Sequence, residues 1–298
     1  MTGILLINKP AGFTSFDVIA KMRGISKIRK IGHAGTLDPM ATGVLPLFFE
    51  GATKACDIMP NQDKRYRARF RLGLTTDTQD ITGKVLSEAP VMATTADVQA
   101  VLERFAGDIE QLPPMYSAIQ VNGQRLYDLA REGKTIERET RPVTVYELNL
   151  LESDDIAHTY TIDVSCSKGT YIRTICHDIG EALGCGATLT ELCRTEAAGF
   201  MLRDCITLEQ AQQESQAGTL FERLLPIESV FAALPRVTLD ERRAKLFQNG
   251  VRLDLVRNKI PRIDGTFAVY GGETKFLGIA HNDYDKNELH MDKLFSLV

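Results

Sequence analysis

The sequence predicts an α+β protein whose mixed, mostly antiparallel central sheet is flanked by helices and followed by a small β-rich module. Predicted strands outnumber the helices between them, which favours a mixed sheet over a doubly wound parallel one. Beyond residue 234 of the 298, short segments are separated by turn dipeptides, namely Asn249-Gly250, Asp264-Gly265 and Gly271-Gly272. We therefore predict a main domain at 1–234 and a separate module at 235–298.

The chain opens with a strand and a helix. The apolar run 4–7 stops at an Asn-Lys-Pro-Ala-Gly turn, which is typical of a buried strand. Thr14 and Asp17 have the spacing of a capping box, so a helix begins there and is expected to end at Gly24. Its expected apolar face consists of Phe16, Ile19 and Ala20.

Further elements of the main domain follow from alternation, apolar runs and caps. Residues 65–72 alternate strictly between arginine and apolar or tyrosine side chains, the pattern of a two-faced strand. Asn122-Gly123 lies between two apolar runs and predicts a hairpin. The other expected elements are strands at 44–49, 143–150 and 158–165 and helices at 53–59, 94–107 and 172–184.

Composition excludes several classes of protein. With 44% hydrophobic and 25% charged residues, the chain is neither disordered nor of low complexity. Its six cysteines contain no Cys-x-x-Cys pair and its five histidines have no paired spacing, so we predict reduced thiols and no metal site. The run 4–7 is too short for a signal peptide or a membrane span. We therefore expect a cytoplasmic protein without membrane association.

Charge is unevenly distributed along the chain. The formal net charge of -4 argues against a nucleic-acid partner. Yet 18–37 and 64–71 each hold five cations and no acid. Acids farther away than the Debye length of roughly 8 Å do not cancel such local fields, which can hold a phosphate backbone. One block alone would be explained as a solvated surface, but two blocks beside one glycine-rich loop make nucleic-acid binding an equal alternative.

The loop 30–43, KIGHAGTLDPMATG, is the first candidate site. Asp38 before Pro39 is also a common helix start, with Asp38 as the N-cap. The three glycines and His33 favour a functional loop instead, because glycines permit close approach of a ligand or of another segment of backbone.

Two further residues are candidates. Arg173 lies in the first turn of a predicted helix, where the helix dipole disfavours a cation unless an anion compensates. The alternative is a solvated surface arginine. Tyr66 lies on the apolar face of the arginine-rich strand, so it is either a core tyrosine or a residue that stacks on a nucleobase.

Five motifs in order resemble those of the TruB-type tRNA pseudouridine-55 synthases, and they span about residues 3–200. They are the segments 3–15, 30–43, 51–54, 64–67 and 165–174. The segment 113–118 with Asn122-Gly123 resembles the RNA-gripping thumb loop of that family, an insertion at about 112–142. The tail resembles its small PUA-type module. Asn8 stands where the family often has Asp.

The resemblance implies a pseudouridine synthase fold and the isomerisation of the T-loop uridine of tRNA, position 55, without cofactor or metal. Asp38 matches the catalytic aspartate, as covalent nucleophile or charge stabiliser, and Arg173 matches the arginine that pairs with it. Tyr66 matches the tyrosine that stacks on the target base and is a candidate general base. His33 matches a histidine that accompanies base flipping, and Leu192 an apolar residue of the pocket.

Two more residues complete the expected substrate-binding set. Lys9 supports its motif, and Arg67 belongs to the basic strand, so that Arg67→Glu is expected to weaken a salt-sensitive affinity for tRNA. The expected partner is the T-arm stem-loop of tRNA, bound by a monomer that acts without a guide RNA.

Two alternatives stay open. One is a tRNA-binding or folding factor without catalysis. The other is a guide-RNA-dependent relative, although such relatives carry N-terminal extensions and this chain begins its first motif at Gly3. Whether Asp38 attacks the ribose or the uracil ring is open as well.

Overall fold

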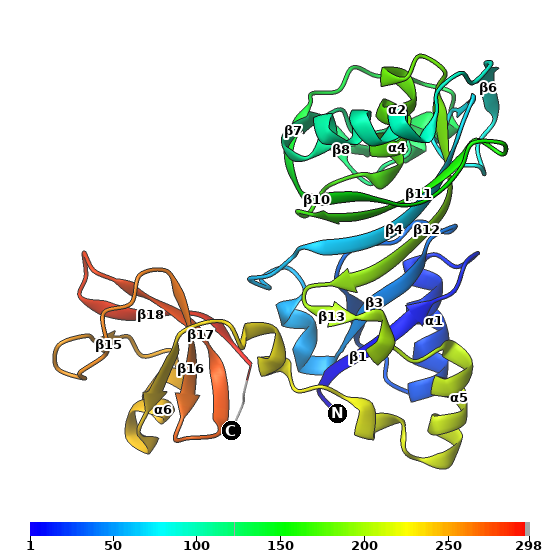
Figure 1. Cartoon of the computed structure of the whole chain (residues 1–298). Coiled ribbons are helices and arrows are strands. Elements are labelled where there is room, and N and C mark those ends of the chain that lie inside the picture. The colour runs from blue at the N-terminus through cyan, green and yellow to red at the C-terminus, as the bar shows by residue number, and fades with distance from the viewer. Residues whose placement is uncertain (122, 296–298) are drawn as a thin grey trace.

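The computed structural model describes residues 1–121 and 123–295, whose strands form two large sheets and two further two-stranded sheets (Figure 1). The larger sheet has nine strands, and all its pairs are antiparallel except β3 with β12. This architecture confirms the predicted α+β class. Its order is β1 (Gly3–Lys9), β3 (Thr42–Phe49), β12 (Ala187–Ala197), β4 (Lys64–Leu72), β11 (Thr159–Cys166), β10 (Arg141–Asp154) and β7 (Gly107–Gln111), with β2 (Ile31–His33) on β3 and β13 (Phe200–Met201) on β12.

Strand β4 occupies the middle of this sheet, between β11 and β12. Its side chains alternate between buried and exposed, as the sequence predicts. Tyr66, Ala68, Phe70 and Leu72 face the core, so the arginines of this strand lie on the opposite face.

Helices cover the sheet in two groups. The helices α1 (Ser15–Ser26) and α5 (Leu208–Ala217) pack beside β1, β2 and β3, whereas α2 (Thr95–Leu102) and α4 (Ile172–Ala182) lie over β4, β10 and β11 (Figure 1). The capping boxes predicted for α1 and α2 are both present. Short 3₁₀ turns η2 (Glu103–Phe105) and η3 (Leu202–Asp204) follow α2 and β13.

Three local predictions were wrong. Helix α1 continues through Gly24 and ends at Ser26, and Lys27, with a φ of 59°, is its left-handed C-cap. It buries Val18, Ile19 and Met22 while Phe16 is exposed, because the strands beneath it decide which face is apolar. The expected helix at 53–59 is the 3₁₀ turn η1 (Glu50–Ala55). Strand β12 was not predicted, since its sequence ATLTELCRTEA mixes polar and apolar residues without a clear period.

Two excursions leave the sheet. The hairpin β5 (Leu74–Thr76) and β6 (Val85–Glu88) follows β4. The expected insertion at about 112–142 contains β8 (Gln120–Val121), β9 (Gln124–Arg125) and α3 (Leu126–Arg131). Strands β8 and β9 pair as a hairpin, although Asn122 of its predicted turn lies outside the described residues.

The second sheet contains the strands after residue 235, in the order β14 (Arg236–Leu239), β16 (Thr266–Gly271), β17 (Lys275–Asp283), β18 (Glu288–Leu294) and β15 (Leu253–Asp254), together with α6 (Glu241–Gln248). The linking segment forms η4 (Leu220–Arg223) and η5 (Ile227–Phe231). Phe231 stacks on Phe276 of β17 and belongs to the same apolar cluster as Ile4 and Phe48 of the first sheet. The smaller sheet is therefore packed onto the larger one.

None of the helices in the described part of the chain combines the length and the apolar character that a membrane crossing requires.

Candidate active site

The loop between β2 and β3 carries Asp38, and hydrogen bonds to the segment 3–15 hold it in place. The backbone N–H of Leu37 donates to Ser15 Oγ at 2.9 Å, and the N–H of Gly12 donates to the Pro39 carbonyl at 2.8 Å. Residues 38–41 form a turn, with the N–H of Ala41 donating to the Asp38 carbonyl, rather than a helix start. The alternative of Asp38 as a helix N-cap is therefore wrong.

Lys9 is the central support of this loop. Its side chain is completely buried, and Nζ donates to the carbonyls of Pro10, Phe13 and Pro39 at 2.5–3.2 Å. Burial lowers the pKa of its ammonium group to about 8. Lys9 therefore holds the turn that follows Asp38, as its expected support of the motif implies, and a direct contact with substrate stays a prediction.

Asp38 forms an ion pair with Arg173, at 3.0 Å between Oδ2 and Nε. Arg173 is the second residue of α4, so the anionic partner expected for a cation in a first helical turn is present. The Arg173 side chain is only 6% exposed, whereas that of Asp38 is 38% exposed. Asp38 therefore presents its carboxylate to the outside, and Arg173 holds it from the inside.

The remaining guanidinium nitrogens of Arg173 are also bound. Nη1 donates to the Thr78 carbonyl at 3.1 Å and lies 3.5 Å from Oδ2 of the buried Asp80, and Nη2 donates to the Tyr116 carbonyl at 2.9 Å. Oδ1 of Asp80 accepts hydrogen bonds from Thr78 and Thr82. The guanidinium is thus fixed in one orientation, because each of its three nitrogens has a partner.

Burial raises the pKa of the Asp38 carboxyl above its ordinary value, and the Arg173 guanidinium opposes this rise. Asp80 adds to the rise and Lys9 opposes it. Arg173 thus favours the ionised form of a carboxylate that its surroundings would otherwise protonate.

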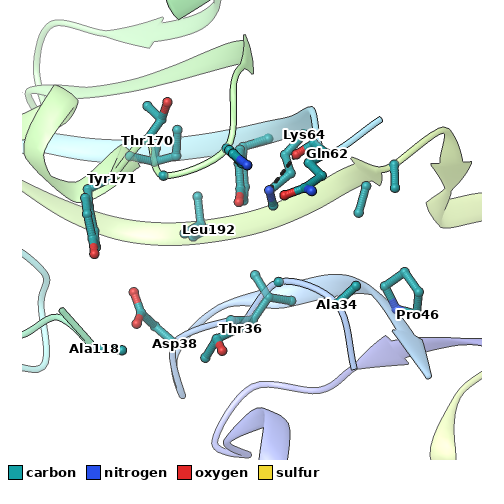
Figure 2. A pocket seen from close by; sticks show the side chains of 18 of the residues that line it. Ala34, Thr36, Asp38, Pro46, Gln62, Lys64, Ala118, Thr170, Tyr171 and Leu192 are labelled. Atoms are coloured by element: carbon teal, nitrogen blue, oxygen red, sulfur yellow. Dashed lines mark hydrogen bonds between the residues drawn. The ribbon is translucent and has the colours of Figure 1, made fainter. Parts of the chain in front are cut away.

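Asp38 lines a cavity of about 360 Å³, within the range of roughly 300–1,000 Å³ that is usual for small-molecule sites. Figure 2 shows Ala34, Thr36 and Asp38 on the loop that forms one wall, and Leu192 of β12 opposite them. The described charged residues of the lining are Asp38 and three cations, Lys64, Lys168 and Arg173. The cavity therefore combines one carboxylate with a positive surrounding.

Tyr66 and Leu192 both line this cavity, as expected. Tyr66 is 6% exposed, and burial raises the pKa of its hydroxyl to about 12, although the nearby Arg194 guanidinium lowers it. Tyr66 is therefore neutral near pH 7.

His33 lies beside the cavity and not in its lining. It ends β2 and contacts the cavity residue Thr36, with 3.2 Å between Nε2 and Oγ1. Its ring meets that of the exposed Phe16 edge to face, at 5.5 Å between centroids. Burial lowers the pKa of His33, so its neutral form is favoured.

Arg67 lies away from the cavity, so its expected contact with the substrate stays a prediction that concerns the outer face of the sheet. The alternation of β4 puts it on the face opposite Tyr66, where it lines a separate surface groove with Arg69 and Glu191. The arginines of this face also have acidic neighbours in space: Arg65 pairs with Glu147 and Asp163, and Arg69 lies 3.8 Å from Glu191. The block 64–71 is free of acid only along the chain.

Sequence reasoning missed two buried charged residues at this site. Asp80 lies in a turn without a recognisable pattern, and Arg194 lies on the unpredicted β12. Arg194 donates to the carbonyls of Val44 and Gly35, and its Nη1 lies 3.2 Å from where a Cβ of Gly35 would be. At Gly43 a Cβ would lie 2.2 Å from the Arg194 carbonyl oxygen. Both glycines have positive φ. Their presence in the loop was therefore the one sign in the sequence that another segment, here the one with Arg194, packs closely against it.

Three family profiles match successive parts of the chain. The description "TruB family pseudouridylate synthase (N terminal domain)" applies to residues 23–172, "tRNA pseudouridylate synthase B C-terminal domain" to 173–232, and "Pseudouridine synthase II TruB, C-terminal" to 235–287.

Curated relatives match nearly the whole chain. A tRNA pseudouridine synthase B of Cupriavidus metallidurans is 43% identical over 285 residues, which cover 93% of this chain and 90% of the relative. One of Clostridium tetani is 43% identical and covers 94% and 95%. Among solved structures, a Cbf5-Nop10-Gar1 complex matches with a TM-score of 0.74 at 25% identity, covering 99% of this chain and 85% of that one.

The fold and the Asp38–Arg173 site, together with these matches, define a pseudouridine synthase. Within that class, the chain belongs to the TruB family.

Proposed function

We propose that this protein converts the T-loop uridine at position 55 of tRNA to pseudouridine, with Asp38 as the catalytic carboxylate. The observation that carries the proposal is the Asp38–Arg173 ion pair at the wall of a positively lined cavity. The relatives described above are tRNA pseudouridine synthases B, which supports tRNA as the substrate.

Base flipping is part of the proposal, because a base stacked inside the RNA cannot enter the cavity that Asp38 lines. A flipped uridine would enter between the loop of Ala34 and Asp38 and the strand that carries Leu192 (Figure 2). Its phosphates would meet the cations Lys64 and Lys168 of the lining, which supports a nucleotide over a neutral ligand. His33, next to Thr36 on the rim, is placed to contact the nucleotide as it turns.

The reaction breaks the bond from N1 of uracil to C1′ of ribose, turns the uracil and bonds C5 to C1′. C5 releases its proton and N1 takes up a proton. No atoms are gained or lost overall apart from the exchange of this proton. The ionised Asp38 carboxylate acts as a nucleophile or stabilises the positive charge that develops on the ribose. Arg173 orients that carboxylate and favours its ionised form.

Tyr66 is proposed to stack on the flipped uracil. A tyrosine with a pKa of about 12 is neutral at physiological pH, which favours packing against the base over a resting role as a proton acceptor. Leu192 completes the apolar wall of the pocket.

The proposal also includes the compartment, the oligomeric state and the roles of two segments of the chain. The protein acts in the cytoplasm, as a monomer without a guide RNA, and the segments 112–142 and 235–298 are a thumb-like insertion and a PUA-like module that grip the RNA. The separate second sheet and the hairpin of β8 and β9 support this division at about residue 234 and the assignment of the insertion.

The direct experiment measures release of tritium from uridine labelled at C5 in a T-arm transcript incubated with the purified protein alone. We expect stoichiometric release, and none from a transcript in which cytidine replaces the target uridine. Absence of release, with tight binding of the same transcript, would favour a binding or folding factor. Activity that requires added partner proteins would favour a guide-RNA-dependent enzyme.

A further inference from the structure

Strands β17 and β18 of the second sheet (Figure 1) bring together two histidines and an aspartate, which are not among the residues that line the cavity. His281 and His290 are directly paired across these antiparallel strands, and their ring centroids are 4.8 Å apart. The nine-residue spacing between them carried no metal signal in the sequence. The expectation that the histidines are scattered is corrected for this pair, because the β17–β18 turn places them side by side.

A β-bulge adds the third residue. Ala280 pairs with Met291 and Ile279 pairs with Lys293, so Asp292 is the extra residue of β18. Bulges redirect side chains, and this one leaves Asp292 Oδ1 at 2.7 Å from His281 Nδ1 and 3.6 Å from His290 Nδ1. All three potential ligand atoms lie within 4.8 Å of one another.

We propose that His281, His290 and Asp292 form a binding site for one Zn²⁺ ion. In a tetrahedral zinc site with bonds of about 2.0–2.2 Å, neighbouring ligand atoms are roughly 3.3 Å apart. The two measured separations from Asp292 Oδ1 lie on either side of that value. Two imidazole nitrogens and one carboxylate oxygen are a ligand set that suits zinc.

His290 shows why a cation fits better than a hydrogen-bond network alone. Its Nδ1 is buried and has no hydrogen-bond partner among the described residues, whereas His281 Nδ1 contacts Asp292. An unpaired buried nitrogen is unfavourable, and a bound cation would satisfy it together with the carboxylate.

The cluster lies at the protein surface, which leaves a place for a fourth ligand. The side chains of His281, His290 and Asp292 are 41%, 42% and 28% exposed, although His290 Nδ1 itself is covered, so a water molecule from solvent can complete the coordination. Three protein ligands with one open position are a recurring arrangement for zinc.

A zinc ion here would stabilise the attachment of the second sheet. Just beyond Asp292, the Leu294 carbonyl accepts a hydrogen bond from Lys54 of η1, and Phe295 packs against Phe231 and Phe276. Fixing β17 to β18 at this point holds the strand that makes these contacts with the first sheet.

The test is titration of the full-length, chelator-treated protein with ZnCl₂ by isothermal calorimetry. We expect one saturable site with a dissociation constant in the micromolar range or below, and a zinc-dependent rise in the thermal unfolding midpoint. His281→Gln, His290→Gln and Asp292→Asn should each weaken binding at least tenfold and abolish that rise. His158→Asn is the matched control, since it removes a histidine from the β10–β11 turn, where φ is 53° and asparagine is tolerated.

Absence of a saturable site in the wild type would overturn the proposal, whatever the variants do. So would equal affinity in the wild type and the three cluster variants, because zinc would then be bound by other groups such as the free cysteines. Unfolding midpoints measured in chelator show whether each variant is folded. None of these readouts depends on the proposed reaction, so the two proposals fail independently.

Discussion

Arginines lie on both faces of the region around β4, and the two faces differ in how these side chains are held. On the cavity side, Arg173 is buried and bonded to Asp38, Thr78 and Tyr116. On the outer side, Arg69 is exposed and lies 3.8 Å from the exposed Glu191, and the half-buried Arg65 pairs with Glu147 and Asp163. Buried pairs are costly to break, whereas exposed pairs contribute little. The proposed chemical site therefore contains a buried, fully bonded arginine and lies on the face opposite the densest run of arginines.

The largest effect is expected from the cavity carboxylate. Asp38→Ala should lower the rate of tritium release by roughly 10⁴–10⁶-fold, as for the loss of other catalytic nucleophiles, and leave RNA affinity within a few-fold of the wild type. Release should be normal in the control Asp204→Ala, which removes an exposed aspartate outside the cavity. An active Asp38→Ala enzyme would refute the assignment of this residue.

The second-largest effect is expected from removing Arg173, the arginine that pairs with Asp38. Arg173→Met leaves Asp38 and Asp80 without their cation, so we expect a loss of about 3–5 kcal/mol in the free energy of unfolding and a rate lower by about 10²–10³-fold.

The same variant should change the pH profile of the rate. Burial raises the pKa of Asp38, and Arg173 lowers it. The ionised carboxylate is therefore lost as the pH falls through the pKa that results. Without Arg173 the pKa rises further, and the acid limb of the single-turnover rate should move to higher pH. An acid limb that stays in place would mean that Arg173 does not act on the ionisation of Asp38.

A smaller effect is expected from the support behind the loop. Lys9→Met leaves the Pro10, Phe13 and Pro39 carbonyls without their donor, and we expect a loss of roughly 2–4 kcal/mol in stability by chemical denaturation. The rate should fall about tenfold because the turn after Asp38 loosens, with RNA affinity unchanged. Lys21→Met, on the exposed face of α1, is the control. A selective loss of RNA affinity would instead show that Lys9 binds substrate.

The smallest effect is expected on the outer face. Arg67→Glu should leave the single-turnover rate unchanged and weaken tRNA binding less than about threefold at physiological salt, because Arg67 lies opposite the cavity. A filter-binding series at several salt concentrations measures this. If the slope of log affinity against log salt concentration becomes shallower by about one, the RNA also contacts Arg67 on the outer face.

Local signals in the sequence predicted much of this fold. The alternation of β4, the capping boxes of α1 and α2 and the apolar spacing of α4 depend on neighbours within a few residues, and the structure contains them. Strand β12 could not be predicted this way, since its burial is decided by β3 and β4, which are distant in sequence. Phe16 of α1 is exposed for the same reason: which face of the helix is buried depends on the strands it packs against, not on its own sequence.

The candidate site was predictable only in part. The sequence pattern indicated the loop of Asp38 and a cation at Arg173 that needs an anionic partner. The structure shows that the two residues form an ion pair with each other. Asp80 and Arg194 gave no local pattern, and the His281–His290 pair depends on a strand register. Charge counted along the chain also hid the acids that adjacent strands bring beside Arg65 and Arg69.

The most direct test of this contrast is a matched pair of Arg→Lys substitutions, one at Arg173 and one at Arg67, compared by the single-turnover rate of pseudouridine formation at saturating RNA. Both keep a positive charge and remove the guanidinium geometry. We predict that Arg173→Lys lowers the rate at least 100-fold and that Arg67→Lys stays within twofold of the wild type. Equal rates in the two variants, or a larger loss at Arg67, would contradict the account.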